Sequence, residues 1–147
     1  MSDIDHRKTA VLDRRTVSLA GAQRIIDAAL ARAEELDCLV SVVVLDAGGN
    51  VSALARRDGV TATVTTVALH KATTALTLRQ ATDEFVAAVR TNEVLVTSLS
   101  SQPGFALIAG GVPLVANGDV VGAVGVSGAR NGKDLDIARA GAGALDR

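Results

Sequence analysis

Two β-branched runs in the last third of the chain predict the centre of the fold. Residues 112–116 and 120–126 are separated by Asn-Gly-Asp at 117–119. An Asn-Gly pair between apolar runs predicts a β-hairpin, because both residues adopt the positive φ of a tight turn. The second run has almost no polar side chain, which is typical of a central strand covered on both faces. Its Gly122 and Gly125 lack a Cβ, so a packed helix or a ligand can approach the backbone there.

The spacing of apolar residues predicts the remaining elements. Steps of four and three along residues 18–36, with Ser18 as the N-cap, predict an amphipathic helix. Further helices are expected over 62–80, over 82–92 with Thr82 as its cap, and over 134–145; further strands are expected over 39–45, 51–56 and 105–109. Residues 93–101 are compatible with either helix or loop.

The order of these elements predicts an α+β domain. All links between consecutive strands are short, so the sheet should be mainly antiparallel with helices packed on it. The length of 147 residues fits one domain over 17–147, preceded by a flexible N-terminal tail over 1–16. Hydrophobic residues make up 48% of the chain, but Phe85 and Phe105 are its only aromatic residues. The core should therefore be aliphatic.

Composition disfavours several classes of partner and site. Lys and Arg total 15 against 16 acidic residues, so no net basic charge would attract nucleic acid. No stretch has the roughly 18 apolar residues of a membrane span, and no apolar segment near the start resembles a secretory signal, so we expect a cytoplasmic location. Cys38 is the single cysteine, His6 falls in the tail, and no phosphate loop or dinucleotide fingerprint is present. The sequence therefore predicts neither a zinc site nor a nucleotide site.

The helix over 62–80 carries the most unusual pattern. Its apolar stripe contains Lys71 between Ala68 and Ala75. A lysine in this position either extends its ammonium to the edge of the core or meets an anionic partner, because burying it unpaired is costly. The neighbouring face is rich in threonine and includes His70. That face could bind a ligand, contact another subunit, or be a chance run of threonines.

Five runs in the chain form a recognisable set. They are VVLDAGGN at 43–50, RRDG at 56–59, the helix lysine Lys71 with Ala72 before Thr74-Ala75, GGVPL at 110–114 and VVGAVGVSG at 120–128. Together these runs resemble the GlcG/HbpS family of haem-binding-like domains. The resemblance extends over about 18–145. It implies a profilin-like, three-layer α/β/α arrangement with a five-stranded, mainly antiparallel sheet, and assembly into a homo-oligomer.

The functions implied by the resemblance are diverse. Some members bind haem or iron, one relative is fused to corrinoid adenosyltransferases, others are encoded beside glycolate-oxidation genes, and one branch is reported as a small lyase acting on hydroxylaminobenzoate. The residue before the helix lysine is frequently acidic in the family, whereas here it is His70. This difference removes a possible carboxylate ligand for iron. It introduces an imidazole that can ligate haem or transfer a proton.

Two hypotheses about function follow, and whether the protein is an enzyme stays open. In the first, a homo-oligomer binds a small molecule such as haem or another tetrapyrrole, with His70 as iron ligand and Lys71 or Arg79 pairing with a propionate. In the second, a cofactor-free lyase or isomerase acts on an anionic organic acid such as a hydroxylaminobenzoate-like aromatic. Lys71 and Arg56 would then bind the carboxylate, with His70 as acid or base. A plain, non-catalytic binder could use the same pocket.

Both hypotheses place the site between the helix around Lys71 and the strand entry at 110–113, because both segments interrupt the core pattern. In the enzymatic hypothesis, backbone N–H groups around Gly110-Gly111 would stabilise developing negative charge. The complete set of expected ligand-binding residues is Arg56, Lys71, Thr74, Arg79, Gly110, Gly111 and Pro113. No metal ligand is expected apart from His70 towards haem iron.

Overall fold

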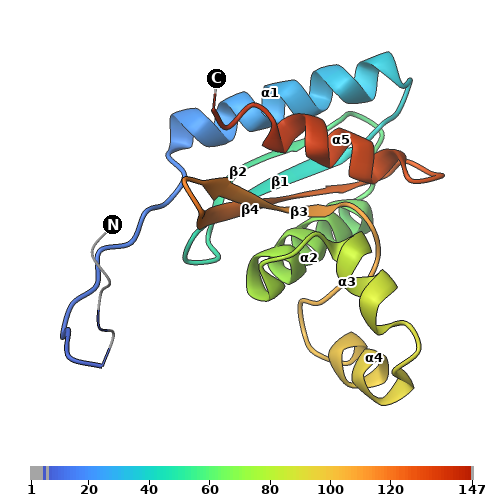
Figure 1. The fold of residues 1–147 in the computed structure, drawn as a ribbon. Coiled ribbons are helices and arrows are strands. Elements are labelled where there is room, and N and C mark those ends of the chain that lie inside the picture. Colours follow the sequence, from blue (N-terminus) through green and yellow to red (C-terminus); the bar gives the residue numbers. More distant parts are fainter. Residues whose placement is uncertain (1–4, 6, 147) are drawn as a thin grey trace.

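The computed structural model describes residues 5 and 7–146 as a three-layer α/β/α domain (Figure 1). Its sheet has four antiparallel strands in the order β2-β1-β4-β3. The strands are β1 (Ser41–Asp46), β2 (Val51–Arg56), β3 (Gly111–Ala116) and β4 (Asp119–Ser127). The predicted α+β class and antiparallel sheet are confirmed, and the five-stranded sheet is wrong for this chain.

The missing fifth strand is the segment over 105–109. It crosses the outer side of the domain instead of pairing with the sheet, because its backbone is bonded elsewhere. Phe105 N–H donates to Gln102 O at 3.2 Å, and Ala106 N–H donates to Thr74 Oγ1 at 2.9 Å. Gly110 then turns the chain into β3 with a φ of 126°, a conformation that favours glycine.

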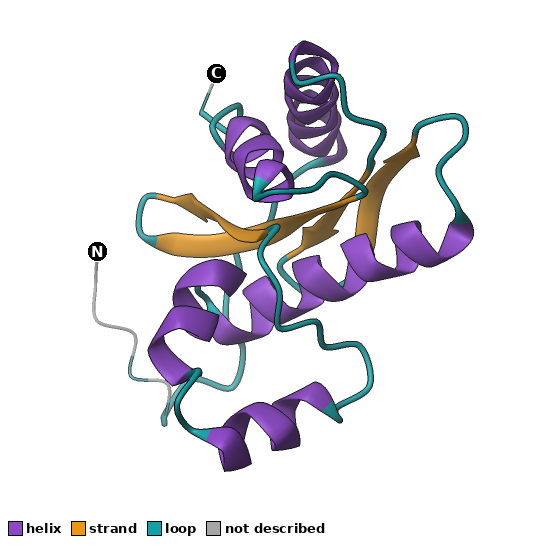
Figure 2. Ribbon diagram, turned by 90° about the vertical axis from the view of Figure 1, so that its right-hand side faces the viewer, coloured by secondary structure: helices purple, strands orange, loops and turns teal. Residues whose placement is uncertain are grey.

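The helices cover both faces of the sheet (Figure 2). Two helices, α1 (Leu19–Glu35) and α5 (Lys133–Ala142), pack side by side on one face. The long helix α2 (Ala62–Leu78) crosses the other face, followed by α3 (Thr82–Val89). The short helix α4 (Glu93–Ser100) lies beyond α2, away from the sheet, and resolves the ambiguity over 93–101 in favour of helix. None of the helices described is long and apolar enough to cross a membrane.

Local signals account for most of the element boundaries. Ser18 Oγ accepts a hydrogen bond from Gly21 N–H at 3.0 Å, which confirms the predicted cap of α1. Positive φ values at Asn117 (51°) and Gly118 (82°) confirm the tight turn between β3 and β4. The prediction that Thr82 caps α3 is wrong. Ala81 is the N-cap, and the Thr82 hydroxyl instead bonds the backbone of β3.

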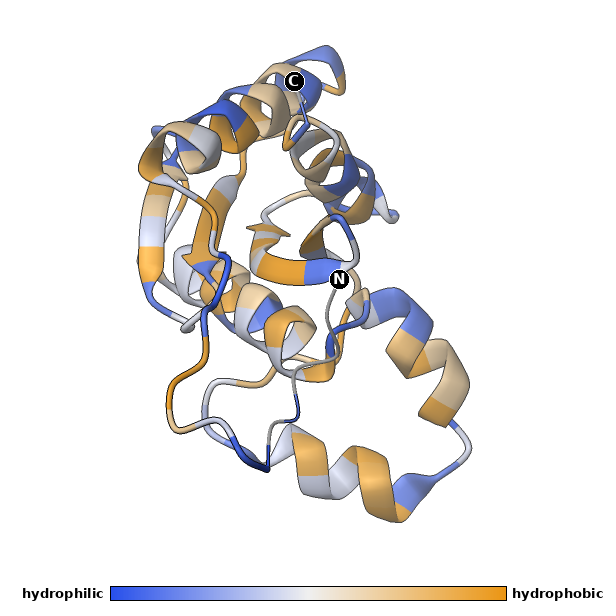
Figure 3. Ribbon diagram, turned by 60° about the vertical axis from the view of Figure 1, so that its left-hand side comes forward, coloured by the Kyte–Doolittle hydropathy of each residue, from blue (hydrophilic) through white to orange (hydrophobic). Residues whose placement is uncertain are grey.

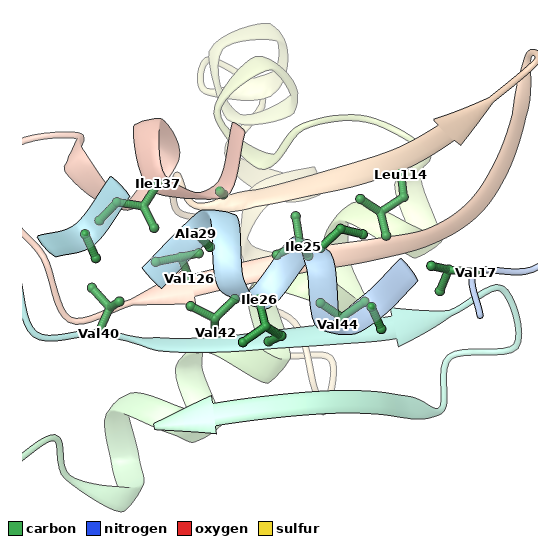
Figure 4. Close-up of a cluster of buried hydrophobic side chains, with 14 of the residues drawn as sticks. Val17, Ile25, Ile26, Ala29, Val40, Val42, Val44, Leu114, Val126 and Ile137 are labelled. Carbon is green, nitrogen blue, oxygen red and sulfur yellow. The ribbon is translucent and has the colours of Figure 1, made fainter. Parts of the chain in front are cut away.

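Aliphatic side chains form a core on each side of the sheet. Alternation along the strands sends Val42 and Val44 towards α1, where they pack with Ile25 (Figure 4). Val43 and Leu45 point the other way and pack against alanines of α2. In Figure 3 hydrophobic residues colour most of the strands, whereas hydrophobic and polar residues alternate along the helices. The predicted aliphatic core is confirmed.

Close packing of α2 on the sheet depends on glycine in β4. A Cβ on Gly125 would overlap the Ala68 carbonyl oxygen and would lie 2.6 Å from Ala72 N. Of the two explanations offered for this glycine, a packed helix is therefore the one observed. This contact brings the middle of α2 against the ends of β3 and β4.

The predicted flexible tail includes residues 1–4 and His6, which lie outside the described part of the chain. The last residues of the tail contact the domain. Arg15 donates to Ala116 O at 3.1 Å, and Thr16 Oγ1 accepts from Ala47 N–H at 2.9 Å.

Candidate functional site

Lys71 is buried where α2 approaches the end of β4. Lys71 is only 2% exposed. Its Nζ donates to Asp134 Oδ2 and to Val126 O, each at 2.9 Å. The other carboxylate oxygen of Asp134 accepts from Ala129 N–H at 2.9 Å. Of the two alternatives for a lysine in an apolar stripe, the anionic partner is the one observed. The ammonium is neutralised within the protein.

Gly110 and Gly111 lie directly against Lys71, as the sequence predicted. A Cβ on Gly110 would lie 2.9 Å from Lys71 Nζ, and one on Gly111 would overlap the Lys71 carbonyl oxygen. The Gly111 N–H group donates to Thr82 Oγ1 at 3.1 Å. The glycines therefore make room for the lysine, and the Gly111 N–H already has a buried acceptor.

Thr74 attaches residues 105–109, called the crossing segment from here on, to α2. Its buried hydroxyl donates to His70 O at 2.7 Å and accepts from Ala106 N–H at 2.9 Å. A Cβ on Gly104 would lie 4.0 Å from Thr73 Cγ2, so the segment runs across the outward side of the helix. These contacts place the segment beside the turn of α2 that carries His70.

His70 itself lies on the outward face of α2 and is half-buried. Among the residues described, its imidazole makes no hydrogen bond. The neighbouring threonine hydroxyls bond their own helix: Thr66 donates to Ala62 O at 3.2 Å and Thr73 to Leu69 O at 3.0 Å. The two ring nitrogens of His70 therefore have no hydrogen-bond partner among the described residues.

The other predicted residues lie apart from this centre. Arg56 ends the edge strand β2, where its guanidinium donates to Val60 O at 2.7 Å, and β1 separates that strand from β4. Arg79 is exposed at the end of α2 with a φ of 53°. Pro113 is half-buried in the edge strand β3. The structure therefore brings together Lys71, Gly110 and Gly111, but not Arg56.

Two contributors were missed by the sequence reasoning, Asp134 and Thr82. A signal for Asp134 existed, because an anionic partner was one of the two alternatives for a lysine in an apolar stripe and Asp134 opens the last predicted helix. Thr82 was recognised only as a cap, since its bond to Gly111 joins residues far apart in the chain. No group of three or more His, Cys, Asp or Glu suited to a metal ion occurs within the described residues.

A cavity of about 280 Å³ lies on the opposite side of the sheet from α2, beside the start of α1. Its lining includes Arg15, Arg24 and Asp146. The Arg15 guanidinium is already bonded to Ala116 O and lies 3.7 Å from Asp119. The cavity is therefore separate from the centre formed by His70 and Lys71.

Comparison with known proteins finds relatives over most of the chain. The family model described as haem degrading protein HbpS-like matches residues 17–143. A 15.0 kDa protein from the dhaT-dhaS intergenic region of Citrobacter freundii is 40% identical over 114 residues, which cover 77% of this chain and 80% of that protein. These matches confirm the resemblance found in the sequence.

Two solved structures share the fold at the level of the whole domain. HbpS is 33% identical with a TM-score of 0.83, covering 92% of this chain and 94% of its own. A PduOC:haem complex is 28% identical with a TM-score of 0.80, covering 89% of this chain and 96% of its own. The similarity therefore includes both helix layers and the sheet.

Proposed function

This chain belongs to the HbpS-like family, and we propose that it is a homo-oligomeric small-molecule-binding protein whose ligand is haem or another tetrapyrrole. The observation that carries the proposal is the half-buried imidazole of His70, which has no hydrogen-bond partner among the described residues. A neutral imidazole nitrogen is a common axial ligand of haem iron. Similarity to the PduOC:haem complex supports this choice of ligand.

The segment beside the His70 turn of α2 carries two apolar side chains, half-buried Phe105 and Ile108, the latter 52% exposed. Arg79 comes nine residues after His70, about 13 Å further along α2 and two and a half turns on, so it lies on the opposite side of the helix from His70. Bound haem would supply an iron centre, which His70 would ligate. The scarcity of aromatic residues means that aliphatic side chains would supply most of the contact area.

The enzymatic alternative makes a stronger demand on the structure. It requires Lys71 to bind a substrate carboxylate, yet Nζ is bonded to Asp134 and Val126 O in a nearly solvent-free position. A substrate would have to displace Asp134 and leave that carboxylate without its cation, at a cost of several kcal/mol. Arg56 also belongs to the far edge of the sheet. These contacts favour the binding hypothesis over the lyase or isomerase.

The proposal is tested by titrating the purified protein with haem and following the Soret absorbance. The wild type should give a saturable shift at micromolar haem. His70→Ala should bind at least about tenfold more weakly, a loss of about 1.4 kcal/mol, with an altered spectrum. Thr66→Ala is the matched control, because Thr66 lies one turn earlier on the same outward face and bonds only its own helix. It should titrate like the wild type.

Two results would overturn the proposal. The first is a wild type that shows no saturable shift. The second is His70→Ala that binds haem with wild-type affinity and spectrum, which would remove His70 from the site.

A further inference from the structure

The cavity beside the start of α1 is built from segments that lie far apart in the chain. It is lined by residues 15–18, the first two turns of α1, both strands of the β3–β4 hairpin and residues 145–146, and its volume is about 280 Å³. This volume lies near the lower end of the roughly 300–1,000 Å³ that small-molecule sites occupy. The helix α2 covers the other face of the sheet, so the cavity is not part of the proposed haem site.

The Arg24 guanidinium extends back along α1 towards the helix cap. Its Nη2 atom lies 4.0 Å from the position that a Cβ on Gly21 would take, and Ser18 Oγ lies 3.4 Å from the same position. Arg24 makes no hydrogen bond and no ion pair with any residue that the structure describes. It is therefore a cation at the cavity wall whose N–H groups are all available to a ligand.

Arg15 contributes a second guanidinium that is only partly bonded. Its Nη1 donates to Ala116 O at 3.1 Å and lies 3.7 Å from Asp119 Oδ2, while Nε and Nη2 make no bond within the described chain. Asp146 is the one acidic residue among the described residues of the lining. Two guanidinium groups and one carboxylate leave the lining with a net positive charge, which a singly charged anion would balance.

Two hydroxyl groups of the lining add further donors. Ser18 Oγ accepts from Gly21 N–H at 3.0 Å, and Thr16 Oγ1 accepts from Ala47 N–H at 2.9 Å. Neither hydroxyl donates to a residue that the structure describes, so each hydrogen can bond an acceptor in the cavity. The polar side chains of the wall thus offer many donors and a single carboxylate, which favours a ligand with acceptor oxygens.

The remaining wall is aliphatic. Val17 and Val121 are buried, at 7% and 4% exposed, and Leu145 is half-buried. A short hydrocarbon chain would remove more of this surface from water. An inorganic anion would leave it without a partner.

We propose that this cavity binds a short-chain aliphatic monocarboxylate. Its carboxylate accepts hydrogen bonds from Arg15 and Arg24, since the guanidinium fork matches the two oxygens of a carboxylate. Its hydrocarbon chain lies against Val17, Val121 and Leu145. The site is independent of the proposed haem site and of His70.

The test is calorimetric titration of the purified full chain with sodium hexanoate in a buffer of low ionic strength. Hexanoate should bind saturably, whereas 1-hexanol, which lacks the charge, and inorganic phosphate, which lacks the chain, should bind at least tenfold more weakly. Arg24→Gln should weaken hexanoate binding at least about tenfold, or about 1.4 kcal/mol. Arg14→Gln is the matched control, because Arg14 is exposed, lies next to Arg15 and does not line the cavity. It should bind like the wild type.

A further variant tests the charge balance of the lining. Asp146→Asn removes the carboxylate that would repel the ligand, so it should bind hexanoate several-fold more tightly than the wild type. Equal melting temperatures check that the variants are folded.

Several results would overturn the inference. These are a wild type without saturable hexanoate binding, Arg24→Gln with wild-type affinity, and Arg14→Gln that loses as much affinity as Arg24→Gln. Phosphate or 1-hexanol that binds as tightly as hexanoate, or Asp146→Asn that binds it more weakly, would also exclude the proposed ligand. A wild type that binds haem but not hexanoate overturns this inference alone.

Discussion

Lys71 and Asp134 form a buried ion pair that joins the two helix layers around the end of the sheet. Nζ of Lys71 in α2 lies 2.9 Å from Oδ2 of Asp134 in α5, and these helices cover opposite faces of the sheet. The Asp134 side chain is only 13% exposed. The same ammonium bonds Val126 O at the end of β4, so three elements meet at one cation.

Removing one partner of this pair should destabilise the domain strongly. We expect Lys71→Met and Asp134→Leu each to lower the free energy of unfolding by about 3–5 kcal/mol, because each leaves a buried polar group without its partner. The double variant should lose clearly less than the sum of the two. Urea unfolding of all four proteins measures the coupling. Additive losses would show that the pair does not act as a unit.

Gly125 should be intolerant of even one methyl group. Gly125→Ala would push α2 away from β4, since the added Cβ overlaps the Ala68 carbonyl oxygen. We expect a loss of about 3 kcal/mol, at the upper end of the cost of overpacking. Gly143→Ala is the control, because its Cβ would meet nothing closer than 3.4 Å and its φ is −65°. Equal melting temperatures for the two variants would contradict this packing.

Thr74 should support the binding surface without contacting the ligand. Thr74→Val removes the acceptor of Ala106 N–H and should cost about 1–3 kcal/mol of stability. Because the crossing segment would lose its attachment beside His70, haem affinity should fall several-fold as well. Thr73→Val is the matched control, since the Thr73 hydroxyl bonds only its own helix. A Thr74→Val protein with unchanged haem affinity would show that the segment plays no part in binding.

The turn at Asp46 should make stability depend on pH in acid. Hydrogen bonds from Asn50, first from its backbone N–H at 2.9 Å, hold the pKa of the Asp46 carboxyl below its ordinary value. The folded state therefore binds this proton less readily than the unfolded state. The contribution of Asp46 is present above the unfolded pKa of about 3.9 and is lost as the pH falls through the folded pKa.

Urea unfolding at a series of pH values measures this effect. Asp46→Asn should be less stable than the wild type at neutral pH, and the difference between them should shrink below about pH 4. A difference that stays constant down to the acid limit would mean that the carboxylate charge does not matter at this turn.

Much of the fold could be predicted because its signals are local. The Ser18 cap, the Asn117-Gly118 turn and the step pattern of α1 each depend on residues within a few positions of one another. The segment over 105–109 was predicted to be a strand because its composition is apolar, as in a strand. Its conformation is decided by Thr74, more than thirty residues earlier, and by the positive φ of Gly110.

In the candidate site too, features that depend on nearby residues could be predicted, and contacts between distant parts of the chain could not. The position of Lys71 in an apolar stripe predicted that an anionic partner was possible. The expectation that Gly110 and Gly111 lie near Lys71 came from the fact that both segments interrupt the core pattern. The identity of that partner depends on how α5 passes the end of β4, which no local pattern encodes. Arg56 was grouped with Lys71 because both are cations near unusual motifs, but the strand order separates them.

Chemical rescue with imidazole tests the central claim, that His70 ligates haem iron, most directly. His70→Ala leaves a gap where the proposed ligand was, and added imidazole can occupy it without the rest of the side chain. Millimolar imidazole should restore the wild-type Soret position to haem-loaded His70→Ala and leave the wild-type spectrum unchanged. If His70→Ala and the wild type have the same spectrum before any imidazole is added, another group holds the iron and His70 is not its ligand.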